Sequence, residues 1–285
     1  SSLTQREMDI ARSIQEVTEE VMLQLSKTIH HETGMEYLCM AGGVALNCVG
    51  NGRLLREGPF KGIWIQPAAV DAGGALGAEL QTYLHMLVYP GTYITLNDSM
   101  KGSYLGPSYS NEAIELYLDG INAKYTRLSD NDFFPIVAKA LAEGKVVGWF
   151  QGRMEFGPRA LGGRSILGDP RNPSMQSLMN LKIKYRESFR PFAPSVLRER
   201  VADYFELNTD SPYMLIVAPV VANRRKYQTT NTKKLWGIDL LNQIRSDIPA
   251  VTHVNYSARV QTVSETDNPP FYRFCLLYTS DAADE

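Results

Sequence analysis

The residues best suited to chemistry in this sequence form a basic segment near the middle of the chain. Residues 153–190 contain eight Lys and Arg residues but only three Asp and Glu residues, a net charge of +5 within a chain whose overall charge is −2. Guanidinium groups bind phosphates and carboxylates through paired hydrogen bonds. The segment therefore predicts a site for an anion, with a solvated basic surface as the alternative.

Two parts of this segment have the composition of ligand-binding loops. In residues 152–165, Arg159 and Arg164 lie among four glycines, which suggests a backbone folded tightly around a negative charge. An ordinary surface loop is the alternative, although this one also contains Phe156 and Leu161.

In residues 180–195, bases interleave with aromatic residues, a composition that can stack a nucleobase and clamp phosphate. Alternatively, one face belongs to the core and the other to solvent. The bases and aromatic residues of this second loop are Lys182, Lys184, Tyr185, Arg186, Phe189, Arg190 and Phe192.

Two glycine-containing turns form a second group of candidates. Gly42 and Gly43 follow a short apolar run and precede a helical pattern, so the backbone can approach a phosphate there. Asn47, one turn later, could hydrogen-bond a ribose or a base, with a tight turn without a ligand as the alternative. Asp71 precedes a second glycine pair, where it could hold a cation or a nucleotide hydroxyl or cap the helix that follows.

Alternating strands and helices are expected to position these candidates. Apolar residues recur at spacings of three and four from Ile10 to Leu25, which predicts an amphipathic helix over residues 1–31. Two short apolar strands, 37–40 and 62–66, each lead through a glycine turn into a helix, a pattern typical of α/β domains with ligands at the strand ends. The second half of the sequence predicts an α+β arrangement. Further helices are expected over 44–55, 71–87, from 111 and over 130–143, further strands over 124–128, 145–150, 214–220 and 258–263, and an irregular linker over 89–107.

Composition excludes several classes of protein. No apolar run approaches the ~18 residues of a membrane-spanning helix, and the sequence begins without a signal peptide. Three cysteines without CxxC spacing cannot form a disulfide framework, so we expect a reducing, cytoplasmic location. The overall charge argues against a general nucleic-acid-binding protein. The four histidines lack the spacing of a metal site, although His253 precedes a strand with Arg259 and could enter a site.

Four separated motifs, in order, resemble the O-carbamoyltransferase family, which includes nodulation-factor and antibiotic-tailoring carbamoyltransferases. The motifs occupy residues 39–47, 66–73, 157–162 and 184–194. The resemblance implies an α/β fold class with two domains. Residues 1–100 would be the C-terminal half of an actin/hexokinase-like ATPase-fold domain, and residues 101–274 an incomplete YrdC-like carbamoyltransferase C-terminal domain. Residues 275–285 are expected to be a non-native tail.

The resemblance also implies an activity, the ATP-dependent transfer of a carbamoyl group from carbamoyl phosphate to a hydroxyl of a small-molecule or glycan acceptor through a carbamoyl-adenylate. A tRNA-modifying or hydrogenase-maturation type of carbamoylating enzyme and a non-catalytic nucleotide-binding module are the alternatives. Neither nucleic acid nor a membrane is an expected partner, and a homodimer is compatible with the sequence. Matched by motif, the catalytic residues are Arg159, Lys184 and Arg186, the residues that bind ATP are Gly42, Gly43, Asn47, Arg164, Ser165 and Arg190, and Asp71 is a ligand of a divalent metal, for which iron is expected.

Two departures from the family pattern bear on what this chain is expected to do. The family's metal site also uses a histidine pair from the first half of its N-terminal domain, and the sequence has no match to that pair, so we predict that these 285 residues alone are inactive. Asn255 and Tyr256 stand where the family usually has Asp-Gly after His-Val, which argues against roles for His253 and Arg259.

Overall fold

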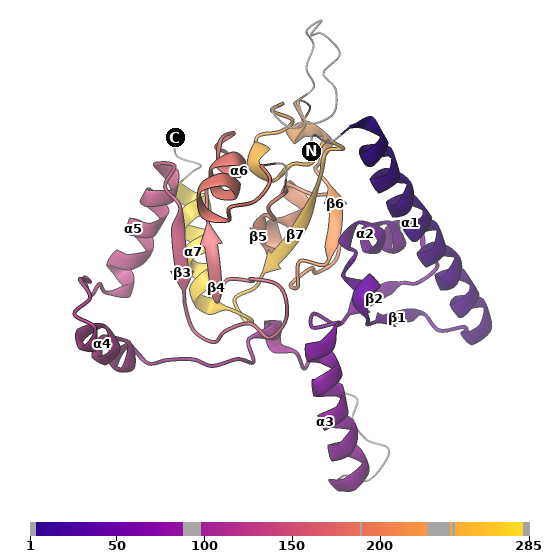
Figure 1. Cartoon of the computed structure of the whole chain (residues 1–285), viewed down its shortest axis with the longest axis horizontal. Helices are drawn as coiled ribbons and strands as arrows, with labels where there is room; N and C mark the ends of the chain where they lie inside the picture. Colours follow the sequence, from indigo (N-terminus) through magenta and orange to yellow (C-terminus); the bar gives the residue numbers. More distant parts are fainter. Residues whose placement is uncertain (1–3, 88–97, 189, 227–239, 241–242, 282–285) are drawn as a thin grey trace, which may run out of the picture.

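The computed structural model describes residues 4–87, 98–188, 190–226, 240 and 243–281 (Figure 1). The first half of the predicted linker, residues 89–97, and Phe189 of the second basic loop therefore lie outside the described residues. The described chain is a mixed α/β structure with two parts, residues 4–87 and 98–281, that contact each other. None of its helices is both long enough and apolar enough to cross a membrane.

The first part alternates helices with a parallel pair of strands. Its elements are α1 (Gln5–Thr33), β1 (Tyr37–Met40), α2 (Cys48–Glu57), β2 (Gly62–Ile65) and α3 (Asp71–Leu87), with β1 paired to β2. The predicted order of strand, glycine turn and helix, repeated twice, is confirmed. The predicted helix over 44–55 is divided at Asn47 into a short 3-10 turn (Gly43–Leu46) and α2, because the Asn47 side chain accepts a hydrogen bond from the Gly50 amide and so caps α2.

Helix α1 turns its apolar stripe away from the rest of the described chain. Its contact with α2 combines a buried side chain with ion pairs, since Met22 lies against Gly50 and Arg53 donates hydrogen bonds to Glu20 (2.6 Å) on α1 and to Glu57 (3.0 Å) on its own helix. The helix is therefore confirmed, but its apolar stripe is not its contact face. The buried residues of α1 are Glu19, Met22, Leu23 and Ser26, whereas the stripe of Ile10, Ile14, Val17, Val21 and Leu25 is exposed.

The second part contains an antiparallel pair of strands and a three-stranded sheet in the order β5–β7–β6, with β5 parallel and β6 antiparallel to β7. Helices α5 and α7 pack against each other beside these strands (Figure 1), and Trp149 lies in the apolar core between them with Leu141 and Phe271. The α+β arrangement agrees with the prediction. The elements are α4 (Asn111–Gly120), α5 (Asp130–Ala142), β3 (Val147–Phe150), β4 (Arg164–Leu167), α6 (Met175–Leu178), β5 (Ser195–Leu197), β6 (Ile216–Pro219), β7 (Ser257–Val263) and α7 (Pro269–Asp281). Residues 275–281 continue α7, and the expectation that they are non-native stays a prediction.

The predicted strand over 124–128 is wrong, because that segment pairs with no other strand of the described chain. Its polar side chains reach back to α4 instead. The hydroxyl of Tyr125 donates to Asp119 (3.1 Å), and Arg127 donates to Glu115 (2.8 Å). Strand propensity measures a fit to a pleated, half-buried surface, and here the neighbouring surface is a helix.

The two parts meet where α2 packs against β6, a contact that we call the α2–β6 seam. Gly52 lies directly against the strand, since a Cβ at this position would lie 2.1 Å from the carbonyl oxygen of Val217. Beside it, Asn51 Nδ2 donates to the carbonyl of Leu215 (3.0 Å), and Arg56 Nη1 donates to that of Val217 (3.1 Å). The seam fixes the first part of the chain against the sheet that carries Arg259.

Candidate anion-binding site

The first basic loop lies against the first part of the chain. Gly157, with a φ of +131°, passes so close to the end of β2 that a Cβ would lie 3.2 Å from the carbonyl oxygen of Pro67. Arg159 then extends toward the turn before α2, where its Nη2 lies 3.5 Å from the carbonyl oxygen of Leu46. Its Nε is buried and has no hydrogen-bond partner among the described residues. The loop thus carries a guanidinium group to the contact between the two parts.

Arg259, on β7, approaches the same place from the sheet. Burial lowers the pKa of Arg259, and the positive charges of Arg159 and Arg186 lower it further, while the neighbouring Cys48 side chain opposes this shift. The charges of Arg159 and Arg186 thus act on Arg259. We call these three half-buried residues, Arg159, Arg186 and Arg259, the arginine cluster.

His253 and Arg245 border the arginine cluster. Burial, together with the charges of Arg259 and Arg245, lowers the pKa of His253 to about 4, so its imidazole is neutral near pH 7. Burial also lowers the pKa of Arg245. Nε2 of His253 and Nη2 of Arg245 are buried atoms that find no hydrogen-bond partner in the part of the chain that the structure describes.

The arginine cluster makes no close ion pair within the described chain, although the carboxylate of Glu187 lies near enough to Arg186 to feel its charge. Among the described residues, no carboxylate lies within ion-pair distance of Arg159, Arg186, Arg245 or Arg259, in contrast to Arg190, which pairs with Glu187 at 2.8 Å. Arg159, Arg186 and Arg259 are half-buried, and like charges partly removed from water are costly, whereas groups of donors with net positive charge bind anions. The arrangement therefore fits a phosphate or a similar anion.

The second basic loop contributes Arg186 to the cluster. Arg186 Nε donates to Asn180 Oδ1 at 2.6 Å, and its guanidinium lies 4.9 Å from the centre of the Phe192 ring. Asn180 is fully buried, and its amide also donates to two carbonyls of the same loop, those of Ser188 and Arg190. Asn180 thus fixes the conformation of the loop and the orientation of the Arg186 side chain. Lys184 is exposed, and the predicted roles of Lys184 and Arg190 stay predictions.

Arg164 and Ser165 take part in the structure of the first loop itself. The guanidinium of Arg164 lies 3.5 Å from the centre of the Phe150 ring, and the Oγ of Ser165 accepts from the amide of Gly162 (2.9 Å). Arg164 also donates to four backbone carbonyls, those of Pro107, Gln151, Gly152 and Gly163. These contacts use the donors of Arg164 within the protein, so its predicted contact with ATP has no support from the geometry.

The glycine turns lie as the sequence predicts, but their ligands are untested. Gly42, with a φ of +90°, has open space where a Cβ would lie. The Asn47 side chain is engaged with Gln15 as well as with α2. Asp71 is exposed at the start of α3. The described residues contain no group of three or more His, Cys, Asp and Glu side chains placed to hold a metal ion.

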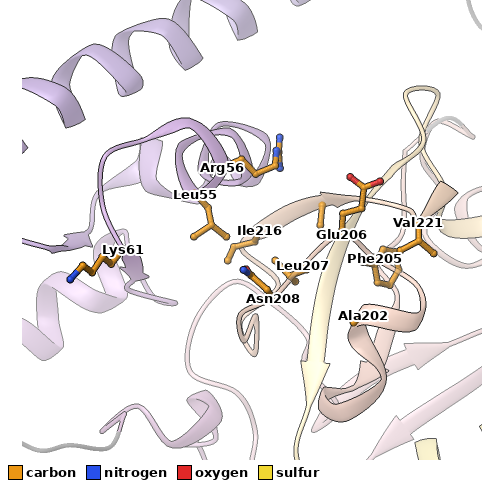
Figure 2. A pocket seen from close by; sticks show the side chains of 11 residues that line it. Leu55, Arg56, Lys61, Ala202, Phe205, Glu206, Leu207, Asn208, Ile216 and Val221 are labelled. Carbon is orange, nitrogen blue, oxygen red and sulfur yellow. The ribbon is translucent and has the colours of Figure 1, made fainter.

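A separate hollow lies beside the α2–β6 seam (Figure 2). Leu55 and Arg56 border it from α2, and Phe205 and Ile216 border it from the second part. Its charged groups have partners inside the protein, since Arg56 bonds to a strand carbonyl and Glu206 pairs with Arg225 at 2.7 Å. This hollow therefore has the character of a packing seam rather than of an anion site.

Arg245 is not among the residues expected from the sequence. His253 precedes a strand with Arg259 and could enter a site, but Asn255 and Tyr256 argue against both residues. In the structure, Arg245, His253 and Arg259 all border or form the cluster. Strand β7 is buried along most of its length, but its sequence, Ser-Ala-Arg-Val-Gln-Thr-Val, is mixed rather than apolar, so nothing in the sequence marks the burial of Arg259. The stretch around Arg245 gives no signal either.

Comparison with known proteins places this two-part α/β chain among the carbamoyltransferases. The model of the carbamoyltransferase C-terminus matches residues 138–282, just over half of the chain, and the model of the carbamoyltransferase N-terminus matches residues 1–80. The chain belongs to the carbamoyltransferase family.

Similar proteins include one from Synechocystis and several that are named for nodulation. The chain is 63% identical over 275 residues to the uncharacterized protein sll1178 of Synechocystis sp., covering 96% of this chain and 45% of that protein. It is 40% identical to nodulation protein NolO of Bradyrhizobium diazoefficiens, covering 94% of this chain and 45% of NolO. It is 35% identical to nodulation protein U of Rhizobium fredii, covering 84% of this chain and 35% of that protein. The chain thus spans less than half the length of these curated relatives.

Proposed function

We propose that this chain supplies the carbamoyl-phosphate site of an ATP-dependent O-carbamoyltransferase, which forms a carbamoyl-adenylate and passes the carbamoyl group to a hydroxyl of a small-molecule or glycan acceptor. The observation that carries the proposal is the arginine cluster, which has no carboxylate within ion-pair distance in the described chain and lies where the two family regions meet. Similarity to proteins named for nodulation supports this reading over tRNA modification, over hydrogenase maturation and over a non-catalytic nucleotide-binding module.

The proposed chemistry depends on the fixed positive charge of the three arginines of the cluster. Arg159, Arg186 and Arg259 would hold the phosphate oxygens of carbamoyl phosphate and stabilise the negative charge that develops on them as the carbamoyl group leaves. His253, neutral near pH 7, would offer its unpartnered Nε2 as a hydrogen-bonding group that carries no charge of its own. Lys184 and Arg190 would approach the same ligand from the exposed side of the second loop.

The remaining assignments belong to the same proposal. The turn with Gly42, Gly43 and Asn47 would line the pocket for ATP. Residues 1–100 would form half of an actin/hexokinase-like ATPase-fold domain and residues 101–274 a YrdC-like domain. A divalent metal, with iron as the expected ion and Asp71 as one ligand, would bind in the longer protein, and the role of the arginine cluster does not depend on it. These 285 residues alone would bind carbamoyl phosphate without transferring the carbamoyl group.

Titration calorimetry with carbamoyl phosphate tests the proposal. Hydrogen bonds to charged groups contribute about 1.5–3 kcal/mol each, so Arg159→Ala and Arg259→Ala should each weaken binding by about 10–100-fold. Arg127→Ala is the matched control, because Arg127 is an exposed arginine that pairs with Glu115, and it should bind as the unchanged chain does. Absence of binding by the unchanged chain, or equal binding by all three variants, would contradict the proposal.

A further inference from the structure

A buried carboxylate closes the base of the loop that carries Arg159. Glu155 is only 7% exposed, and its side chain accepts hydrogen bonds from the backbone amides of Leu161 (2.6 Å), Gly163 (2.8 Å) and Arg164 (3.1 Å). These amides lie six to nine residues further along the chain. The carboxylate thus joins the two ends of a loop, and Arg159 lies between them.

Backbone carbonyls at the end of this loop accept hydrogen bonds from side chains that lie outside the loop. The carbonyl of Leu161 accepts from the Tyr104 hydroxyl (2.6 Å) and from Gln261 Nε2 (2.7 Å), and that of Gly162 accepts from Trp149 Nε1 (2.8 Å). Gly163 leaves no space for a side chain, since a Cβ would lie 2.6 Å from the carbonyl oxygen of Arg153. The end of the loop is therefore rigid, and Glu155 is the group that ties its beginning to that end.

We propose that Glu155 is a positioning residue, whose carboxylate folds residues 155–164 into one loop conformation and so sets the place of Arg159 in the carbamoyl-phosphate site. The inference rests on the proposed function for the identity of the ligand. Both carboxylate oxygens face backbone amides, so Glu155 acts through Arg159 and makes no contact of its own with the ligand.

A carboxylate suits this place for a chemical reason. Three N–H groups converge on one spot, and an ionised carboxylate offers two oxygens with about four acceptor positions and no donor. Hydrogen bonds from amides to an ionised acceptor are also stronger than neutral ones. A glutamine would keep one oxygen for Leu161 and Gly163 but would turn an NH₂ group toward the amide of Arg164. An aspartate would keep the charge but is one methylene too short to reach.

Two variants separate hydrogen-bonding geometry from charge. Amide hydrogen exchange is measured on peptides from residues 156–164 without ligand, and carbamoyl-phosphate affinity is measured by calorimetry on the same 285-residue proteins. We expect Glu155→Asp to speed exchange and to raise the Kd by about tenfold or more, since at least one charge-assisted hydrogen bond is lost. Glu155→Gln should show slower exchange and a lower Kd than Glu155→Asp, because two of the three amides keep an acceptor.

Asp169→Asn is the matched control, because Asp169 is also a buried carboxylate and binds Arg171, its own turn and the Tyr278 hydroxyl, away from residues 155–164. It should leave the exchange of residues 156–164 and the Kd unchanged even if it lowers the melting temperature. Unaltered exchange in Glu155→Asp would overturn the inference, as would faster exchange with an unaltered Kd. If the unchanged chain does not bind carbamoyl phosphate, the proposed function is wrong, and exchange in Glu155→Asp alone then decides whether Glu155 orders the loop.

Discussion

Gly52→Ala is a direct test of the α2–β6 seam. The added Cβ would lie 2.1 Å from the carbonyl oxygen of Val217 and 3.0 Å from its carbonyl carbon. A carbon–oxygen contact needs roughly 3.3–3.6 Å, and both neighbours are backbone atoms of a paired strand that cannot rotate away. Helix α2 must therefore move away from β6 by about 1 Å or more.

The structure allows a rough magnitude for this change. Overpacking of this kind costs about 1–3 kcal/mol. The displacement also strains two hydrogen bonds that cross the seam, from Asn51 and from Arg56, each worth about 1 kcal/mol. The higher helix propensity of alanine offsets about 1 kcal/mol of this loss. We therefore expect a net destabilisation of about 3 kcal/mol.

Urea unfolding followed by circular dichroism measures this effect. Gly74→Ala is the matched control, because Gly74 lies in α3 with nothing within 4 Å of an added Cβ, and it should stabilise the protein by about 0.5–1 kcal/mol. Equal unfolding midpoints for the two variants would refute the seam geometry. A lower midpoint for Gly52→Ala with weaker carbamoyl-phosphate binding would also agree with the position of Leu46 and Arg159 at the same contact.

Two further predictions concern the site. His253 has a folded-state pKa of about 4 against an ordinary value of 6.5, so between these values the unfolded chain binds a proton that the folded chain does not. The free energy of unfolding should therefore fall by up to about 3 kcal/mol as the pH drops from about 7 to about 4, and His253→Gln should flatten this profile in urea titrations. An unchanged slope would show that another group titrates. Arg164→Ala should lower the unfolding free energy by about 2 kcal/mol, since it removes several hydrogen bonds and the contact with Phe150. Arg153→Ala, which removes one bond to the carbonyl of Gly106, should cost much less, and equal losses would count against a structural role for Arg164.

Local chemistry explains why much of the fold could be predicted. The short apolar strands and the glycine turns after them are determined by neighbouring residues, and so is the Asn47 cap of α2. The segment 124–128 has the composition of a strand, yet its side chains bond to Glu115 and Asp119 of α4. The apolar stripe of α1 is exposed for a similar reason. Its periodicity predicts a helix but does not say which face of that helix meets a neighbour.

The candidate site was predictable only in part. Arg159 and Arg164 belong to one motif and look equivalent in the sequence, but the fold directs the first to the cluster and surrounds the second with carbonyl oxygens. Arg259 joins the cluster from a strand 100 residues after Arg159, a proximity that the β5–β7–β6 sheet creates. Spacing along the chain carries no information on such contacts.

A crystal structure of this chain with carbamoyl phosphate tests the central claim most directly. We predict phosphate oxygens within hydrogen-bonding distance of the guanidinium groups of Arg159, Arg186 and Arg259, with Glu155 still bound to the loop amides. A ligand bound elsewhere on the basic segment, or an arginine cluster that stays without the anion at saturating concentration, would contradict it.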